Sequence, residues 1–104
     1  MNRKGEVYQH SQLAGIISEI EYGYSFQYDE QFLKTGTAIS FSLPLQKEPY
    51  KSNKLFPFFE GLLPEGWTLN IYLSVLKIDE DDKFGLLLAT CQDCIGAVSI
   101  KEIK

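Results

Sequence analysis

The first third of the chain has the alternating hydrophobic pattern of β-strands. Two apolar runs, "GEVYQ" and "LAGIISEI" (residues 13–20), precede a segment with an aromatic residue at every second position. These aromatic residues are Tyr22, Tyr24, Phe26 and Tyr28. Because successive side chains of a strand point to opposite faces, the spacing predicts a half-buried strand whose aromatic face belongs to the core and is not a ligand platform. Gly23 allows a tight turn or a bulge.

A second alternating segment, "ISFSLP", follows in the sequence. Ile39, Phe41 and Leu43 would lie on one side of a strand, with serines on the other side. Pro44 would end this strand because proline donates no ladder hydrogen bond. Residues 46–54 are polar, and we expect a loop there.

The hydrophobic spacing then changes to that of helices. Residues 55–62 carry apolar side chains at positions i, i+3, i+4 and i+7, which predicts a first helix. Pro57 is tolerated in its first turn, and Pro64 closes the segment. A second helix is expected from near Glu65 to about Lys77.

A third helix is expected after the acidic run "DEDD", residues 79–82. Asp79 or Asp81 would cap this helix, and carboxylates in its first turn would suit the positive end of the helix dipole. Its predicted apolar stripe consists of Phe84, Leu87, Leu88 and Cys91. The last segment, "GAVSIKEI", predicts a strand that returns to the sheet.

These elements predict an α+β fold, in which about three helices pack on a small antiparallel sheet. The length of 104 residues predicts a single domain over residues 1–104. Such a chain buries roughly 60–70% of the surface that its unfolded form exposes. It therefore needs neither a disulfide nor a metal ion for a stable core.

Charge and composition exclude several classes of protein. The net charge is −4 and the basic residues are scattered, so we expect no direct contact with nucleic acid. The apolar runs are too short to span a bilayer. The segment "MNRKGEVYQHSQ" lacks the apolar core of a signal peptide, so we expect a cytoplasmic protein with no membrane partner.

The two cysteines form one CxxC motif, Cys91 to Cys94. A structural zinc site needs four ligands, and the only histidine, His10, is distant in sequence and is interpreted as a surface residue. We therefore expect neither a metal nor a cofactor, and interpret the cysteines as reduced thiols near the core. A small thiol enzyme is the alternative. It is disfavoured because the motif follows a predicted helix and because Asp93 would raise the pKa of the thiols.

The only tryptophan, Trp67, lies at the start of the second predicted helix. The core face of that helix would consist of Leu69, Tyr72, Leu73 and Leu76. On a helical wheel Trp67 lies about 160° from Leu69, accompanied by Ile71. Two interpretations remain open: Trp67 folds back onto the core, or it projects as an anchor for another protein, a role in which tryptophan is common.

Four segments of the chain resemble the N-terminal subdomain of HipA-like serine/threonine kinases, in the order and at the spacing of that family. They are "FQYDEQFL", "ISFSLPL", "FFEGLLPEGW" and "DKFGLLLATCQDCIGAVSI". The resemblance covers residues 16–100, and the "LLPEG" and "DCIGAV" segments are specific only in combination. Gly61 departs from the family pattern, which usually has Asn at this position.

The resemblance implies a protein that is not an enzyme, because the sequence has no Gly-rich phosphate loop and no HRD-like or DFG-like run. It implies the small antitoxin of three-component HipBST systems, in which the kinase toxin HipT lacks this subdomain and HipB binds DNA. The expected partner is a HipT-like kinase, with a HipB-type protein as a further partner in a ternary complex. A scaffold that bridges kinase and repressor without inhibition is the alternative.

On this interpretation the partner-binding residues share the second predicted helix and the turn before it. They are Pro64, Glu65, Gly66, Trp67 and Ile71. Trp67 would lie near the nucleotide cleft of the kinase. The acidic run at residues 79–82 is interpreted as a capped, solvated helix start, and a contact with a basic patch of the kinase is the alternative.

Overall fold

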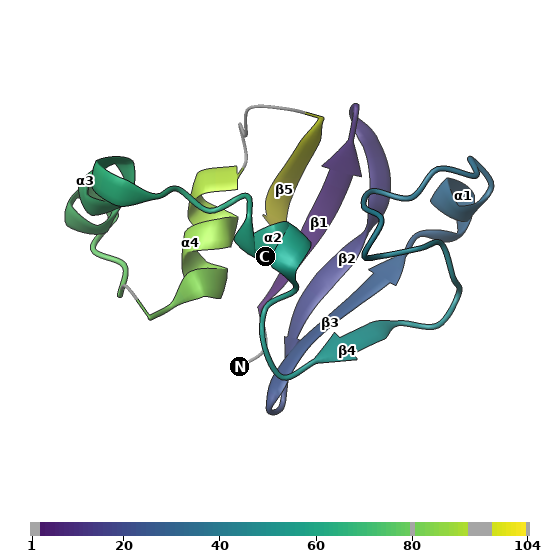
Figure 1. Cartoon of the computed structure of the whole chain (residues 1–104), viewed down its shortest axis with the longest axis horizontal. Coiled ribbons are helices and arrows are strands. Elements are labelled where there is room, and N and C mark those ends of the chain that lie inside the picture. The colour runs from purple at the N-terminus through teal and green to yellow at the C-terminus, as the bar shows by residue number, and fades with distance from the viewer. Residues whose placement is uncertain (1–2, 80, 92–96, 104) are drawn as a thin grey trace.

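The protein is built on one five-stranded antiparallel sheet with the strand order β4-β3-β2-β1-β5 (Figure 1). The computed structural model describes residues 3–79, 81–91 and 97–103. The strands are β1 (Lys4–Gln9), β2 (Gln12–Ile20), β3 (Gly23–Tyr28), β4 (Tyr50–Ser52) and β5 (Val98–Ile103). The helices are α1 (Glu30–Leu33), α2 (Pro57–Glu60), α3 (Gly66–Leu76) and α4 (Lys83–Thr90). The predicted α+β class is confirmed.

One face of the sheet forms half of the core. Ile17 on β2 is paired with Phe26 on β3, and Val7 on β1 with Ile100 on β5; all four side chains are fully buried. Helices α2 and α4 cover this face, as Figure 1 shows. The core is therefore a two-layer arrangement in which aromatic and aliphatic side chains of sheet and helices interdigitate.

The strands and the aromatic face were predicted correctly except at one end. Tyr24 is half-buried, and Phe26 and Tyr28 are buried. Tyr22, by contrast, is 88% exposed, because it lies in the β2–β3 turn with φ 67°. Tyr22 therefore precedes the strand and does not share its alternation.

The predicted strand at Ile39–Leu43 is wrong. Ser40 and Leu43 form an isolated bridge around a tight turn, and Phe41 at the tip of this turn is fully exposed. The buried hydroxyl of Tyr28 accepts a hydrogen bond from the Ile39 amide at 3.1 Å and donates one to the Leu43 carbonyl. A side chain thus satisfies the backbone groups that a neighbouring strand would otherwise pair.

The segment at residues 46–54, predicted as a loop, contains the edge strand β4. Only three residues pair with β3, and Pro49 precedes them. Short edge strands next to proline limit further strand addition. The hydrophobic pattern of three residues is too short to be distinguished from a loop.

The helices depart from prediction in length and capping. The first predicted helix is reduced to the single turn of α2, with Pro57 in its first turn as expected. The N-cap of α4 is Asp82 and not Asp79 or Asp81, because the Asp82 side chain accepts a hydrogen bond from the Gly85 amide at 3.1 Å. The predicted stripe of α4 is confirmed, since Phe84, Leu87, Leu88 and Cys91 are all buried.

Candidate functional site: the exposed face of helix α3

Helix α3 lies at one end of the molecule, on the side of α4 that is away from most of the sheet (Figure 1). It contains 11 residues, and none of them is buried. An isolated helix of this length is marginal in water, so helices of this kind usually depend on packing.

The side chains of α3 separate into two stripes. Leu69, Tyr72 and Leu73, predicted as a core face, are only half-buried and do not belong to the core cluster. Leu76, predicted for the same face, is 41% exposed, so the prediction is wrong for this residue. The inner stripe therefore attaches the helix only partly.

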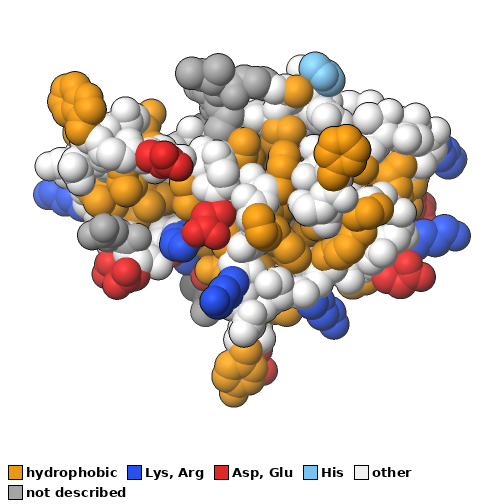
Figure 2. Space-filling model, viewed as in Figure 1, with side chains coloured by type: hydrophobic (Ala, Val, Ile, Leu, Met, Phe, Trp, Pro, Cys, Tyr) orange, Lys and Arg blue, Asp and Glu red, His pale blue; other side chains and the backbone are white. Residues whose placement is uncertain are grey.

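The outer stripe of α3, which we call the α3 face, consists of Trp67, Ile71 and Val75. Trp67 is 77% exposed, Ile71 45% and Val75 72%. Residues spaced by four lie along one side of a helix, so the three side chains form a continuous apolar ridge. Hydrophobic side chains are visible over α3 in Figure 2. The interpretation in which Trp67 folds back onto the core is wrong.

The backbone before α3 fixes where this face points. Glu65 is the N-cap with extended backbone (φ −128°), and no side chain caps the helix. Gly66 has φ +59°, a conformation that residues with a Cβ rarely adopt. The chain therefore turns sharply between Pro64 and Trp67, in a conformation that glycine adopts without strain.

The structure brings the five predicted partner-binding residues together at the N-terminal end of α3. Pro64 is half-buried, whereas Glu65, Gly66, Trp67 and Ile71 are exposed. Val75 was missed, although its spacing of four from Ile71 carried the signal.

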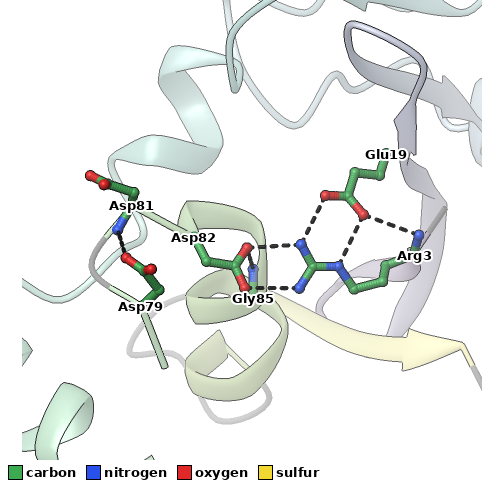
Figure 3. A network of polar contacts seen from close by, with 6 residues as sticks. All are labelled: Arg3, Glu19, Asp79, Asp81, Asp82 and Gly85. Carbon is green, nitrogen blue, oxygen red and sulfur yellow. Dashed lines mark hydrogen bonds and ion pairs between the residues drawn. The ribbon is translucent and has the colours of Figure 1, made fainter. Parts of the chain in front are cut away.

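The polar contacts nearest to α3 lie where the chain enters α4. Arg3 makes paired hydrogen bonds to Glu19 (Nε–Oε1 2.9 Å, Nη2–Oε2 2.8 Å) and to Asp82 (Nη1–Oδ2 3.0 Å, Nη2–Oδ1 2.8 Å), as Figure 3 shows. Its guanidinium also lies 5.5 Å from the ring centroid of Phe84. The hydrogen bonds from Arg3 lower the pKa of both carboxyl groups, and the two carboxylates raise the pKa of Arg3.

Cys91, the first cysteine of the motif, lies at the end of α4, as predicted. Cys91 is buried and is the C-cap residue of α4, with Sγ 3.5 Å from the Leu62 carbonyl oxygen. Asp93 and Cys94 lie outside the described residues. Within the described ranges, no cluster of three His, Cys, Asp or Glu side chains could hold a metal ion.

Two further features lie away from α3. A cavity of about 530 Å³ is lined by residues 36–41 and Pro44, next to the exposed Phe41. His10 is exposed in the turn between β1 and β2, as predicted.

Among the described residues, no helix is long and apolar enough to cross a membrane.

Comparisons with known proteins agree with this architecture. The HipA N-terminal domain family matches residues 5–101. A solved structure of the N-terminal domain of HipA toxin superimposes with a TM-score of 0.78 at 31% identity, over 98% of this chain and 93% of that one. An uncharacterized protein of Haemophilus influenzae is 36% identical over 98% of this chain and 94% of its own length.

A longer relative is a putative kinase. The putative kinase Y4mE of Sinorhizobium fredii is 29% identical over 90% of this chain, which spans only 23% of that protein. The fold is that of the N-terminal domain of HipA toxin, which indicates a toxin–antitoxin-related role. The chain belongs to the HipA N-terminal domain family.

Proposed function

We propose that this protein is an antitoxin that binds and inhibits a HipA-like serine/threonine kinase of the HipT type, which is the role of HipS in HipBST systems. The observation that carries the proposal is the α3 face, where Trp67, Ile71 and Val75 are exposed on a helix without a single buried residue. A kinase core that lacks its own N-terminal domain would offer the matching surface.

Interface energetics support Trp67 as the anchor. A standard interface buries about 800 Å² per partner, and a few residues, most often Trp, Tyr and Arg, contribute most of its binding energy. The turn at Gly66 holds the indole at the start of a formed helix, so docking costs little backbone entropy. Burial of this ridge on a kinase would remove apolar surface from water on both partners.

The lengths of two relatives, compared with the length of this chain, also support action on a separate kinase. The chain spans nearly all of the Haemophilus influenzae relative but about a quarter of the putative kinase. The same domain is therefore found in a relative of similar size and in a much longer one. A domain joined to a kinase is held there by the chain as well as by its interface, whereas a separate one would have to bind through exposed side chains such as those of the α3 face.

Inhibition follows if Trp67 occupies space that the kinase needs for phosphate transfer. The anchor would enter near the nucleotide cleft, supported by Ile71 and by the turn at residues 64–66. The protein needs no catalytic group of its own for this mechanism, because it acts by occupying a surface.

The proposal is tested with the purified protein and a HipT-type kinase in an autophosphorylation assay. Trp67→Ala should weaken inhibition at least about 30-fold, the factor that corresponds to a hot spot of roughly 2 kcal/mol. The matched control is Tyr22→Asn, which removes an equally exposed aromatic and suits the positive φ of that position. It should inhibit like the wild type.

Three outcomes would contradict the proposal. If Trp67→Ala inhibits as well as the wild type, Trp67 is not the anchor. If the protein binds the kinase without slowing it, and a HipB-type repressor joins the complex, the protein is a scaffold. If no binding occurs at all, the antitoxin assignment is wrong.

A further inference from the structure

Helix α3 belongs to an excursion of the chain that begins after Leu63, which still packs against the core, and that returns at α4. We call the described residues of this excursion, 64–79, 81 and 82, the α3 arm. Lys83 Nζ and Glu60 Oε1, which flank the arm, form an ion pair at 2.6 Å that closes its base. Because both side chains are about half exposed, solvent weakens this pair. The arm therefore needs a firmer attachment if α3 is to keep one direction.

Arg3 provides that attachment from outside the arm. Its guanidinium joins Asp82, the last residue of the arm, to Glu19 on strand β2 through two paired contacts (Figure 3). The backbone of Arg3 is itself tied to β2, because the Glu19 amide donates to the Arg3 carbonyl at 2.8 Å. Paired Arg–carboxylate contacts restrict orientation as well as distance.

Asp82 has two functions in this arrangement. Its Oδ1 accepts hydrogen bonds both from Arg3 and from the Gly85 amide, so one carboxylate caps α4 and binds the sheet at once. A Cβ at position 85 would lie 2.2 Å from Asp82 Oδ2 and 3.0 Å from Arg3 Nη1. The first turn of α4 therefore accommodates this contact only with glycine at position 85.

Apolar packing does not replace this attachment at the end of the arm. Ile78 lines, together with Arg3, Asp82 and Leu88, an open surface hollow of about 240 Å³ beside the end of the arm. Close apolar packing between the end of the arm and α4 could otherwise fix the direction of α3 without ion pairs. Beside this hollow, orientation depends on the directional contacts of Arg3.

We infer that Arg3 is the positioning residue of the α3 arm, and that it sets the direction in which the α3 face is presented to a partner. The claim that Arg3 fixes the direction of α3 concerns the domain alone, whereas the consequence for partner binding rests on the proposed function. Arg3 itself does not need to touch the partner. When Arg3 is removed, Glu19 and Asp82 are left as two facing carboxylates that repel each other.

The test compares Arg3→Gln with Lys4→Gln, which removes the same charge from the neighbouring residue, an exposed lysine. Backbone ¹⁵N relaxation is measured for α3 and α4 in the free full-length protein. In the wild type and in Lys4→Gln both helices should show order parameters near 0.85; in Arg3→Gln those of α3 should fall below about 0.6 while α4 and the sheet stay rigid. If Arg3 only stabilised the fold as a whole, Arg3→Gln would lower the order parameters of all helices and strands together.

Arg3→Lys serves as the second variant, because a single ammonium cannot make both paired contacts. It should give α3 order parameters between those of the wild type and Arg3→Gln, and it keeps the test valid if Arg3→Gln does not fold. Unchanged α3 order in the folded Arg3 variants overturns the inference.

Kinase inhibition by the same variants separates this inference from the proposed function. If α3 loosens and inhibition falls roughly 10-fold in Arg3→Gln, both stand. If α3 loosens but the wild-type protein inhibits no kinase, only the proposed function fails.

Discussion

Helices α3 and α4 follow each other in the chain and contain three leucines each, yet they contribute to the protein in opposite ways. In α4, Phe84 and residues 86–88 are buried, whereas α3 has no buried residue. Both helices carry an apolar stripe that would suit a core. The comparison teaches that the stripe alone does not decide burial; the direction in which the backbone leaves the preceding turn does.

The physical difference lies at the helix starts. Asp82 caps α4 and is bound to the sheet through Arg3, so α4 begins on the surface that it must cover. No side chain caps α3, which begins at a glycine in the left-handed conformation. We interpret α4 as the stabilising helix and α3 as the helix that is presented outward.

The largest predicted effect is the loss of the α4 core aromatic. Phe84→Ala should lower the free energy of unfolding by about 3–5 kcal/mol, because it removes a fully buried ring and leaves a cavity. The matched change on α3, Leu73→Ala, should cost only about 1 kcal/mol, because that side chain is half-buried. Urea denaturation followed by circular dichroism measures both. Equal losses would mean that α3 belongs to the core and would remove the contrast.

Sequence patterns predicted the elements in which local alternation and tertiary burial agree. Strands β1, β2, β3 and β5 and the stripe of α4 belong to this group.

Phe41 shows why the other elements could not be predicted. Its alternation with Ile39 and Leu43 is that of a strand, but the hydroxyl of Tyr28, 11 residues earlier than Ile39, binds the two backbone groups and turns the chain. Periodicity contains no information on such a distant hydrogen bond.

For the candidate site, the helical wheel placed Trp67 nearly opposite Leu69, but it left open whether the ring folds back onto the core, and it did not predict the reach of the arm. Leu76 was assigned to the core because the wheel describes angle and not distance from the sheet. The Arg3 contacts were not predicted at all. Arg3 and Asp82 are 79 positions apart in sequence, and neither has a pattern around it that points to the other.

A smaller effect is predicted on acidification. Arg3 lowers the pKa of Glu19 and Asp82 in the folded state, so these groups stabilise the fold above their unfolded pKa values of about 4, and that stability is lost as the pH falls through the folded pKa values. Their side chains are 26% and 35% exposed, so solvent screening limits the contribution to about 1 kcal/mol.

Thermal unfolding between pH 7 and pH 2.5 measures this contribution. In the wild type the melting temperature should decline below about pH 4.5, and in Arg3→Gln the decline should be shallower, because the two carboxyl groups then lose the interaction that keeps them ionised. An identical pH profile of the two proteins would show that the Arg3 contacts contribute nothing to stability and would weaken the contrast between the starts of α3 and α4.

The smallest effect on stability is predicted for Val75→Ser, at the far end of the α3 face. The side chain is 72% exposed, and Val and Ser have similar helix propensities, so the free energy of unfolding should change by less than about 0.5 kcal/mol. Binding to the kinase should nevertheless weaken, by roughly 3- to 10-fold, because the ridge that begins at Trp67 loses its last apolar side chain. Asn70→Ser is the matched control, since Asn70 is exposed but lies off the ridge. Isothermal titration with each variant gives the affinities.

Equal affinities for Val75→Ser and Asn70→Ser would limit the contact to the first turns of α3. A loss of stability in Val75→Ser would contradict the assignment of this face to a partner.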